Sequence, residues 1–158
     1  MKTECTQKAF VFASHFSRRV VAEFCGDRVS SDGGALLLRE VDGKVDLLGR
    51  LSACFTDQRD QRRVEHPLSS LLSQRIYGLA LGYEDLNDHE QLRTDPLFAL
   101  LSGKRELESA LAGKSTLNRL ELCEGKKRYH KIDYSSAAID RLLVDLYLES
   151  QAAPPEEI

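Results

Sequence analysis

The sequence lacks the features that place a protein in or across a membrane. Its longest apolar runs are far shorter than the roughly 20 residues that a membrane-spanning helix needs. The N-terminus also lacks a positively charged segment followed by an apolar stretch and a cleavage site, which argues against secretion. We therefore expect a cytoplasmic protein with no membrane partner.

Motifs of metal binding and catalysis are absent as well. The cysteines form no Cys-x-x-Cys pair, so we expect reduced thiols rather than structural zinc or disulfides. The sequence contains no Gly-rich phosphate loop, nucleophile elbow or His-Glu-x-x-His pattern. We therefore assign no catalytic residue, metal ligand or cofactor to the chain. The four widely spaced cysteines are Cys5, Cys25, Cys54 and Cys123.

Two aspartates could be read as functional carboxylates, but helix capping explains them more simply. Asp32, with Ser31 before it, precedes a helical pattern, and an N-cap is the routine role of such a residue. Asp85 and His89 have the i, i+4 spacing that could bring both side chains to one metal ion. A helix-start aspartate beside a surface histidine is the more common arrangement, and we favour it here.

Basic residues are not in excess, so a nucleic-acid contact would need a local patch. The net charge is −3 over 158 residues, a length that suits one domain with a real core. Positive charge gathers in the segments 56–65 and 125–131, and Tyr129 lies within the second. Each segment is explained either as a solvated loop or as a phosphate-contacting patch. The candidate DNA-binding residues are Arg59, Arg62, Arg63, Arg119, Lys126, Lys127, Arg128 and Lys131.

The middle of the chain has the clearest helical pattern. Apolar residues recur at helical spacing after Pro67, and Gly82 is a natural left-handed stop. We expect a second helix to open at Asp85 and a third at Asp95, which is followed by proline. Gly103 is expected to end this third helix.

The flanking segments complete a mainly α fold with a short N-terminal β-hairpin at 9–25. The hairpin strands are expected at 9–13 and 19–25, with no convincing third strand in the chain. One helix should follow Asp32 with Gly43 as its stop or break, and another should run from about Val45 to Phe55.

Two further helices are expected, one capped by Ser115 and the last by Ser135 or Ser136. The helix after Asp32 is expected to bury Leu37, Leu38 and Val41. The last helix carries an apolar stripe, and the proline-containing segment 151–158 has the composition of a linker. The stripe consists of Ile139, Leu142, Leu143, Leu146 and Tyr147.

Four segments resemble the N-terminal part of bacterial insertion-sequence transposases of the DDE group 1 type. They occur in the right order and cover roughly a third of the chain. The second is long and unusual in composition, which makes it the most specific. The segments are VSSDGGALLLREVD (Val29–Asp42), QRIYGLALGYEDLNDHEQLRTDP (Gln74–Pro96), STLNRLE (Ser115–Glu121) and APPEEI (Ala153–Ile158).

The resemblance implies a DNA transposase, whose full-length relatives hold Mg²⁺ on three acidic residues of an RNase H-like core. In those relatives the stretch like Pro154–Ile158 leads directly into the strand that carries the first catalytic aspartate. We therefore expect residues 1–150 to be an N-terminal helical region and 151–158 a linker towards a core that this chain lacks. The expected product is truncated and inactive alone, with insertion-sequence DNA ends, itself or full-length transposase as partners. A non-DNA oligomerisation or inhibitor module is the alternative.

Overall fold

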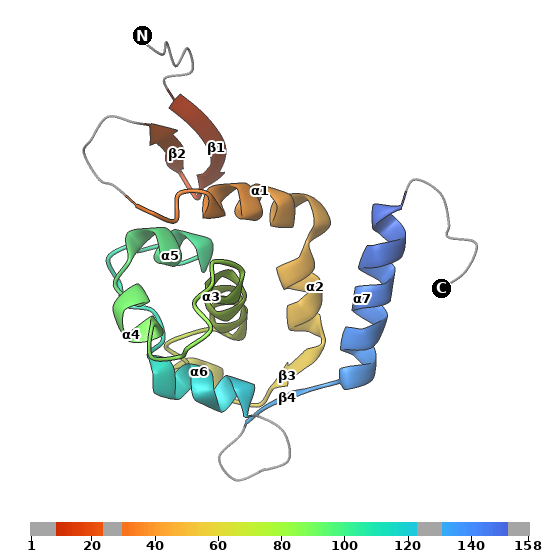
Figure 1. The fold of residues 1–158 in the computed structure, drawn as a ribbon. Coiled ribbons are helices and arrows are strands. Elements are labelled where there is room, and N and C mark those ends of the chain that lie inside the picture. The colour runs from red at the N-terminus through yellow and green to blue at the C-terminus, as the bar shows by residue number, and fades with distance from the viewer. Residues whose placement is uncertain (1–8, 24–29, 123–130, 152–158) are drawn as a thin grey trace.

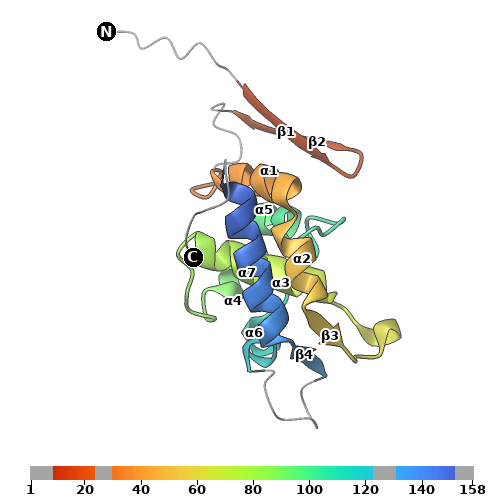
Figure 2. The ribbon, with the colours of Figure 1, turned by 90° about the vertical axis from the view of Figure 1, so that its right-hand side faces the viewer.

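Helix α3 forms the centre of the molecule. The computed structural model describes residues 9–23, 30–122 and 131–151. Helices α2, α5 and α6 contact α3, and α7 packs on the far side of α2 (Figures 1 and 2). The elements in chain order are β1 (Ala9–His15), β2 (Arg18–Glu23), α1 (Ala35–Val45), α2 (Leu47–Ala53), β3 (Phe55–Asp57), the 3-10 helix η1 (Gln61–Arg63), α3 (Leu68–Ala80), α4 (His89–Leu92), α5 (Pro96–Leu101), α6 (Lys114–Glu121), β4 (Ile132–Tyr134) and α7 (Ser136–Ser150).

The predicted mainly α fold with an N-terminal hairpin is confirmed. Strands β1 and β2 pair antiparallel, with Phe12 opposite Val20. Val20 is 7% exposed and packs with Leu36 of α1 and Leu100 of α5. The hairpin thus obtains from α1 and α5 the apolar support that an isolated two-stranded ribbon needs. Figure 1 shows it lying above α1, at the edge of the helical body.

The predicted helix ends at Gly82 and Gly103 and the predicted helix start at Asp95 are confirmed. Gly82 and Gly103 have φ of 90° and 70°, the left-handed backbone that favours glycine at helix ends. The Asp95 carboxylate accepts a hydrogen bond from Leu97 N–H at 2.7 Å, with Pro96 in the first turn of α5. The expected helix start at Asp85 is wrong. Its carboxylate instead accepts Asn87 N–H at 2.8 Å in a turn, and α4 begins only at His89.

Two other predicted caps, those of Asp32 and Ser115, are wrong. Asp32 accepts the Tyr83 hydroxyl at 2.9 Å, while Gly34 occupies the N-cap of α1. α6 begins at Lys114, one residue before Ser115, and the Lys114 N–H donates to the Glu90 carboxylate at 2.8 Å. At α6, a tertiary contact to Glu90 therefore supplies the acceptor that a local cap was expected to supply. The predicted Ser135 cap is confirmed, because its Oγ accepts Ala138 N–H at 3.3 Å.

Helix α1 continues past Gly43 and ends before Asp46, which has φ of 53° and separates it from α2. The α1 face that we expected to be buried is exposed instead. Leu37 and Val41 are 62% and 55% exposed, and Leu38 is also exposed. The buried residues are Ala35 and Leu36. Ala35 belongs to the same core cluster as Tyr77, and Leu36 belongs to the same cluster as Val20. The run of four apolar residues at the start of α1 offered two possible inner faces, and the smaller alanine permits closer packing.

Helix α7 buries only one residue of its predicted apolar stripe. Leu142 is buried, whereas Leu143 and Tyr147 are 57% and 50% exposed. The helix is attached to the body through α2, where Arg50 donates two hydrogen bonds to the Glu149 carboxylate at 2.7 and 3.0 Å. α1 and α7 consequently both present apolar side chains to solvent.

The expectation of no third strand is also wrong. β3 and β4 form a second antiparallel ribbon of three residues each, with Phe55 opposite Tyr134 and Asp57 opposite Ile132. Ile132 belongs to a core cluster whose other buried members come mainly from α3 and α6. Strands this short show no alternation that periodicity could detect.

Candidate nucleic-acid interface

The β3–β4 ribbon brings the basic segment 56–65 beside Lys131, the one residue of the segment 125–131 that the structure describes. Beyond the strand pairs, Gln58 N–H donates to the Lys131 carbonyl at 2.7 Å. Residues just after β3 therefore lie beside the residue just before β4. Figure 1 shows this ribbon at the end of the molecule opposite α1, next to α6. Segments that are far apart in sequence thus contribute to one surface.

A cleft of about 420 Å³ opens where these segments meet α6. Three of its residues were predicted as DNA contacts, namely Arg59, Arg63 and Lys131, and the structure brings these three together. We call this site the basic cleft. The complete lining is Arg59, Asp60, Arg63, Val64, Glu65, His66, Thr116 and Lys131.

Arg59 holds the cleft in shape. Its guanidinium donates to both Asp57 carboxylate oxygens at 2.8 and 2.7 Å and to the His66 carbonyl at 3.1 Å. Both side chains of this ion pair are largely buried, with 22% and 12% exposed. The Arg59 hydrogen bonds lower the pKa of the Asp57 carboxyl, so the pair remains charged at neutral pH. Arg59 therefore ties the loop after β3 to the segment before α3.

Arg63 is arranged differently, because it is available to a ligand. Its side chain is 88% exposed, and its contact with Asp60 across 3.9 Å is long. Such a surface pair contributes about 1 kcal/mol or less, so a phosphate can replace the Asp60 carboxylate at little cost. The Asp60 side chain caps η1 by accepting Arg62 N–H, which places the exposed Arg62 on the same turn. Lys131 is exposed as well.

His66 supplies a neutral imidazole at the wall of the basic cleft. It is 9% exposed, and its Nδ1 has no hydrogen-bond partner in the described part of the chain. Burial lowers its pKa, and the charge of Lys104 lowers it further, so the ring is neutral at pH 7. Sequence reasoning missed both His66 and Thr116 as cleft residues, since neither belongs to a basic run.

Two other predicted DNA contacts, Arg62 and Arg119, are described by the structure but do not line the basic cleft. Arg119 is exposed on α6. Lys126, Lys127 and Arg128 lie outside the described residues.

His89 is not the surface residue that we expected. It is completely buried, and its Nδ1 lies 3.3 Å from the Gln74 side-chain amide nitrogen. Burial lowers the pKa of His89, which keeps the ring neutral. Arg75 lies 3.4 Å from the other ring nitrogen and donates to the Tyr83 and Glu84 carbonyls at 3.1 and 2.8 Å. This network joins α3 to the turn before α4 and is structural.

The family comparison decides the identity of the chain. The family model described as transposase DDE domain group 1 matches residues 12–158. The chain belongs to the group 1 DDE transposase family. The comparisons with curated proteins and with solved structures gave no match. The DDE transposase match begins within β1 and includes β2, α3 and the basic cleft, so the whole helical body lies within the family region.

The DDE transposase family implies divalent-metal chemistry, but the described residues do not form a site for it. No group of three or more His, Cys, Asp or Glu side chains converges among them in a way that could hold a metal ion. Asp32 and Asp85, two of the carboxylates in the family-like segments, are bonded to Tyr83 and Asn87. We therefore derive no catalytic step through Mg²⁺ for this part of the protein. None of the described helices is long and apolar enough to cross a membrane.

Proposed function

We propose that this region binds the DNA ends of an insertion sequence during transposition, and that the basic cleft is the contact surface. The observation that carries the proposal is the β3–β4 pairing, which places Arg63 and Lys131 on one cleft although they come from distant segments. Family membership supports DNA as the ligand in general. The choice of insertion-sequence ends rests on the sequence resemblance.

The cleft has the chemistry of a phosphate-backbone contact. Arg63 and Lys131 are exposed cations, whereas Arg59 is bound to Asp57 and positions the loop that carries Arg63. Thr116 can add a hydroxyl from the first turn of α6. Contacts of this type fix a protein on the duplex without reading bases. We assign no catalytic residue to this chain, and the proposal does not require cleavage activity.

The experiment that tests the proposal is a gel-shift assay with insertion-sequence terminal repeats and scrambled duplexes at several salt concentrations. We expect the Arg63→Gln/Lys131→Gln double variant to bind more weakly and to lower the slope of log affinity against log salt by about 1.8, or about 0.9 for each lost phosphate contact. Arg141→Gln is the matched control, because Arg141 is exposed on α7 and lines no part of the basic cleft. An unchanged affinity and slope in the double variant would refute the cleft as the contact surface.

A second function, self-association without DNA, is favoured by one observation. α1 and α7 expose large apolar side chains to solvent, and grouped apolar side chains of this kind often mark an interaction surface. They include Leu37, Val41, Leu143 and Tyr147. Association through such surfaces persists at high salt, unlike DNA binding. Sedimentation at high salt therefore separates the two functions. We expect Leu143→Asp to remove any salt-independent dimer, and a monomer at all concentrations would contradict this second function.

A further inference from the structure

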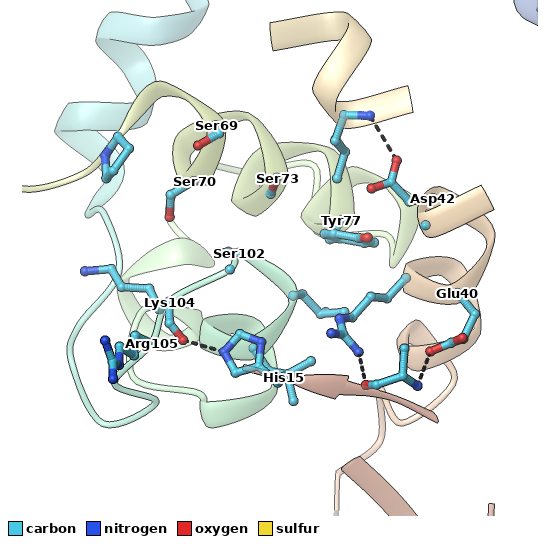
Figure 3. Close-up of a pocket in the computed structure, with 18 of the residues that line it drawn as sticks. His15, Glu40, Asp42, Ser69, Ser70, Ser73, Tyr77, Ser102, Lys104 and Arg105 are labelled. Atoms are coloured by element: carbon cyan, nitrogen blue, oxygen red, sulfur yellow. Dashed lines mark hydrogen bonds between the residues drawn. The ribbon is translucent and has the colours of Figure 1, made fainter. Parts of the chain in front are cut away.

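A second cavity lies on the other side of the segment that precedes α3. This groove of about 670 Å³ is bordered by α3, α1, the end of β1 and the segment after α5. Figure 3 shows serines and a tyrosine of α3 in a row on one side, with Ser102, Lys104 and Arg105 on the other. We call it the serine groove. Its lining includes three serines and two cations, namely Ser70, Ser73, Ser102, Lys104 and Arg105.

Hydroxyl groups form the floor of the serine groove. Ser70, Ser73 and Ser102 are all buried, with 7%, 9% and 4% exposed. The Ser102 hydroxyl has no hydrogen-bond partner within the described ranges 9–23, 30–122 and 131–151. A buried hydroxyl without a partner is costly, and a bound acceptor would remove that cost. Burial raises the pKa of Tyr77 to about 12, so its hydroxyl remains protonated beside these serines.

The first turn of α3 adds backbone donors to the same groove. Pro67 occupies the N-cap position and makes no side-chain cap hydrogen bond. The first N–H groups of a helix have no partner within the helix, and the helix dipole makes this end favourable for an anion. Ser69 and Ser70 of this turn line the groove, as does Pro67. This helix end borders a groove that is also lined by Ser102, whose buried hydroxyl has no partner among the described residues.

Two cations stand at this end of the groove. Lys104 is held in place because its Nζ donates to the Ala110 carbonyl at 3.2 Å and its own carbonyl is bonded to His15 Nε2 at 2.6 Å. Arg105 is exposed and lies 5.9 Å from the centre of the Phe16 ring. Figure 3 shows Lys104 and Arg105 on the side of the groove where α3 begins.

Two of the three carboxylates that line the groove, those of Glu40 and Asp42, are engaged elsewhere, whereas the third, Glu65, is 81% exposed beside His66. Glu40 accepts Ala13 N–H at 2.6 Å, and Asp42 accepts Leu48 N–H at 2.9 Å. Both belong to α1, at the opposite end of the groove from Lys104 in Figure 3. The end formed by Ser102, Lys104 and the first turn of α3 carries two cations and one carboxylate, Glu65, whose exposed side chain can extend into solvent when an anion binds.

We propose that the serine groove binds a phosphate group at the end formed by Ser102, Lys104 and the N-terminus of α3. Phosphate matches this donor set because it accepts several hydrogen bonds and carries the negative charge that lysine and a helix N-terminus favour. The inference goes beyond the proposed function, since these residues do not line the basic cleft. The phosphate can belong to a DNA backbone that continues from the basic cleft, or to a small phosphate ester.

Calorimetric titration with inorganic phosphate, against chloride at matched ionic strength, tests the site. We expect Ser102→Ala and Lys104→Gln each to weaken phosphate binding about tenfold, the usual effect of losing one hydrogen bond to a charged group. Ser102→Ala should leave the thermal midpoint unchanged or higher, because the lost hydroxyl has no partner in the described chain. This separates binding from folding. Arg105→Gln gives a second cation variant in case Lys104→Gln disturbs its loop.

Arg141→Gln serves as the charge-matched control, because Arg141 lies on α7 outside the serine groove. A DNA titration then distinguishes the two sources of phosphate. Weaker DNA binding by Ser102→Ala indicates a backbone phosphate, whereas lost phosphate binding with intact DNA affinity indicates a small ester. Absence of phosphate binding by the unaltered protein, or equal binding by all variants, would overturn the proposal. Neither result would alter the test of the basic cleft, which uses Arg63 and Lys131.

Discussion

Replacing Gln74 with leucine should destabilise the protein strongly, although glutamine is usually a surface residue. Gln74 is 1% exposed at the centre of α3, and its side-chain amide bonds both backbone groups of Ala112. The amide nitrogen donates to the Ala112 carbonyl at 2.8 Å, and Ala112 N–H donates to the amide oxygen at 3.1 Å. Gln74 thereby fixes the segment before α6 against α3.

The size of the effect follows from the groups left without partners. Ala112 is completely buried, so leucine at position 74 would strand a buried N–H and a buried carbonyl. Each stranded group costs about 1–3 kcal/mol, and the two together about 2–6 kcal/mol. Burial of the leucine side chain would recover part of this, so we expect a net loss of about 2–4 kcal/mol.

Urea unfolding at pH 7.5, followed by circular dichroism, measures this free energy. Gln91→Leu is the matched control, because Gln91 is exposed on α4 and its substitution should change the stability little. A loss below about 1 kcal/mol in Gln74→Leu would refute the argument that this amide satisfies the Ala112 backbone.

Three further predictions concern groups near the core and the cleft. Stability should fall as pH decreases below about 6.5, because burial lowers the pKa of both His66 and His89 in the folded protein. Below that pH the unfolded chain binds more protons than the folded chain. Equal urea midpoints at pH 7.5 and 5.5 would contradict this prediction. Gly78→Ala should destabilise by about 1–3 kcal/mol in thermal melts despite the better helix propensity, since its Cβ would lie 2.8 Å from His89 Cε1. Asp57→Asn should cost about 2 kcal/mol and weaken DNA binding, because it releases the Arg59 guanidinium that shapes the basic cleft; wild-type unfolding and gel shifts would exclude that role.

Local signals in the sequence predicted several helix ends correctly, although they failed at Asp85, whose partner Asn87 is only two residues away. Asp95, Ser135, Gly82 and Gly103 act within one or two turns, and all four were predicted correctly. The same reasoning failed for Asp32, whose partner Tyr83 is 51 residues away. Capping propensity describes what a side chain can do, and tertiary contacts decide what it does.

The candidate site was predictable as charge but not as geometry. Positive charge in 56–65 and 125–131 is evident from the sequence, whereas the pairing of Asp57 with Ile132 depends on contacts across the chain. The sequence also does not distinguish Arg59, which is bound to Asp57, from the exposed Arg63. The pairing of short strands depends on contacts between distant parts of the chain, and apolar periodicity carries no information about it.

The α1 and α7 predictions show a different difficulty. Apolar periodicity correctly indicated helices at both places, but Leu37 and Leu143 lie on faces that the described chain leaves exposed. A helix with apolar residues on more than one side can pack through either. Which face is covered depends on neighbours that sequence spacing does not reveal.

A gel-shift assay at several salt concentrations is the sharpest test of DNA binding by the basic cleft. It compares the unaltered protein with the Arg63→Gln/Lys131→Gln variant on insertion-sequence ends and scrambled duplexes. We expect the unaltered protein to bind the ends more tightly than scrambled duplexes. The variant should bind more weakly, and its slope of log affinity against log salt should be lower by about 1.8. No retention of the unaltered protein at low salt, or identical curves for protein and variant, would contradict a DNA-binding role for the basic cleft.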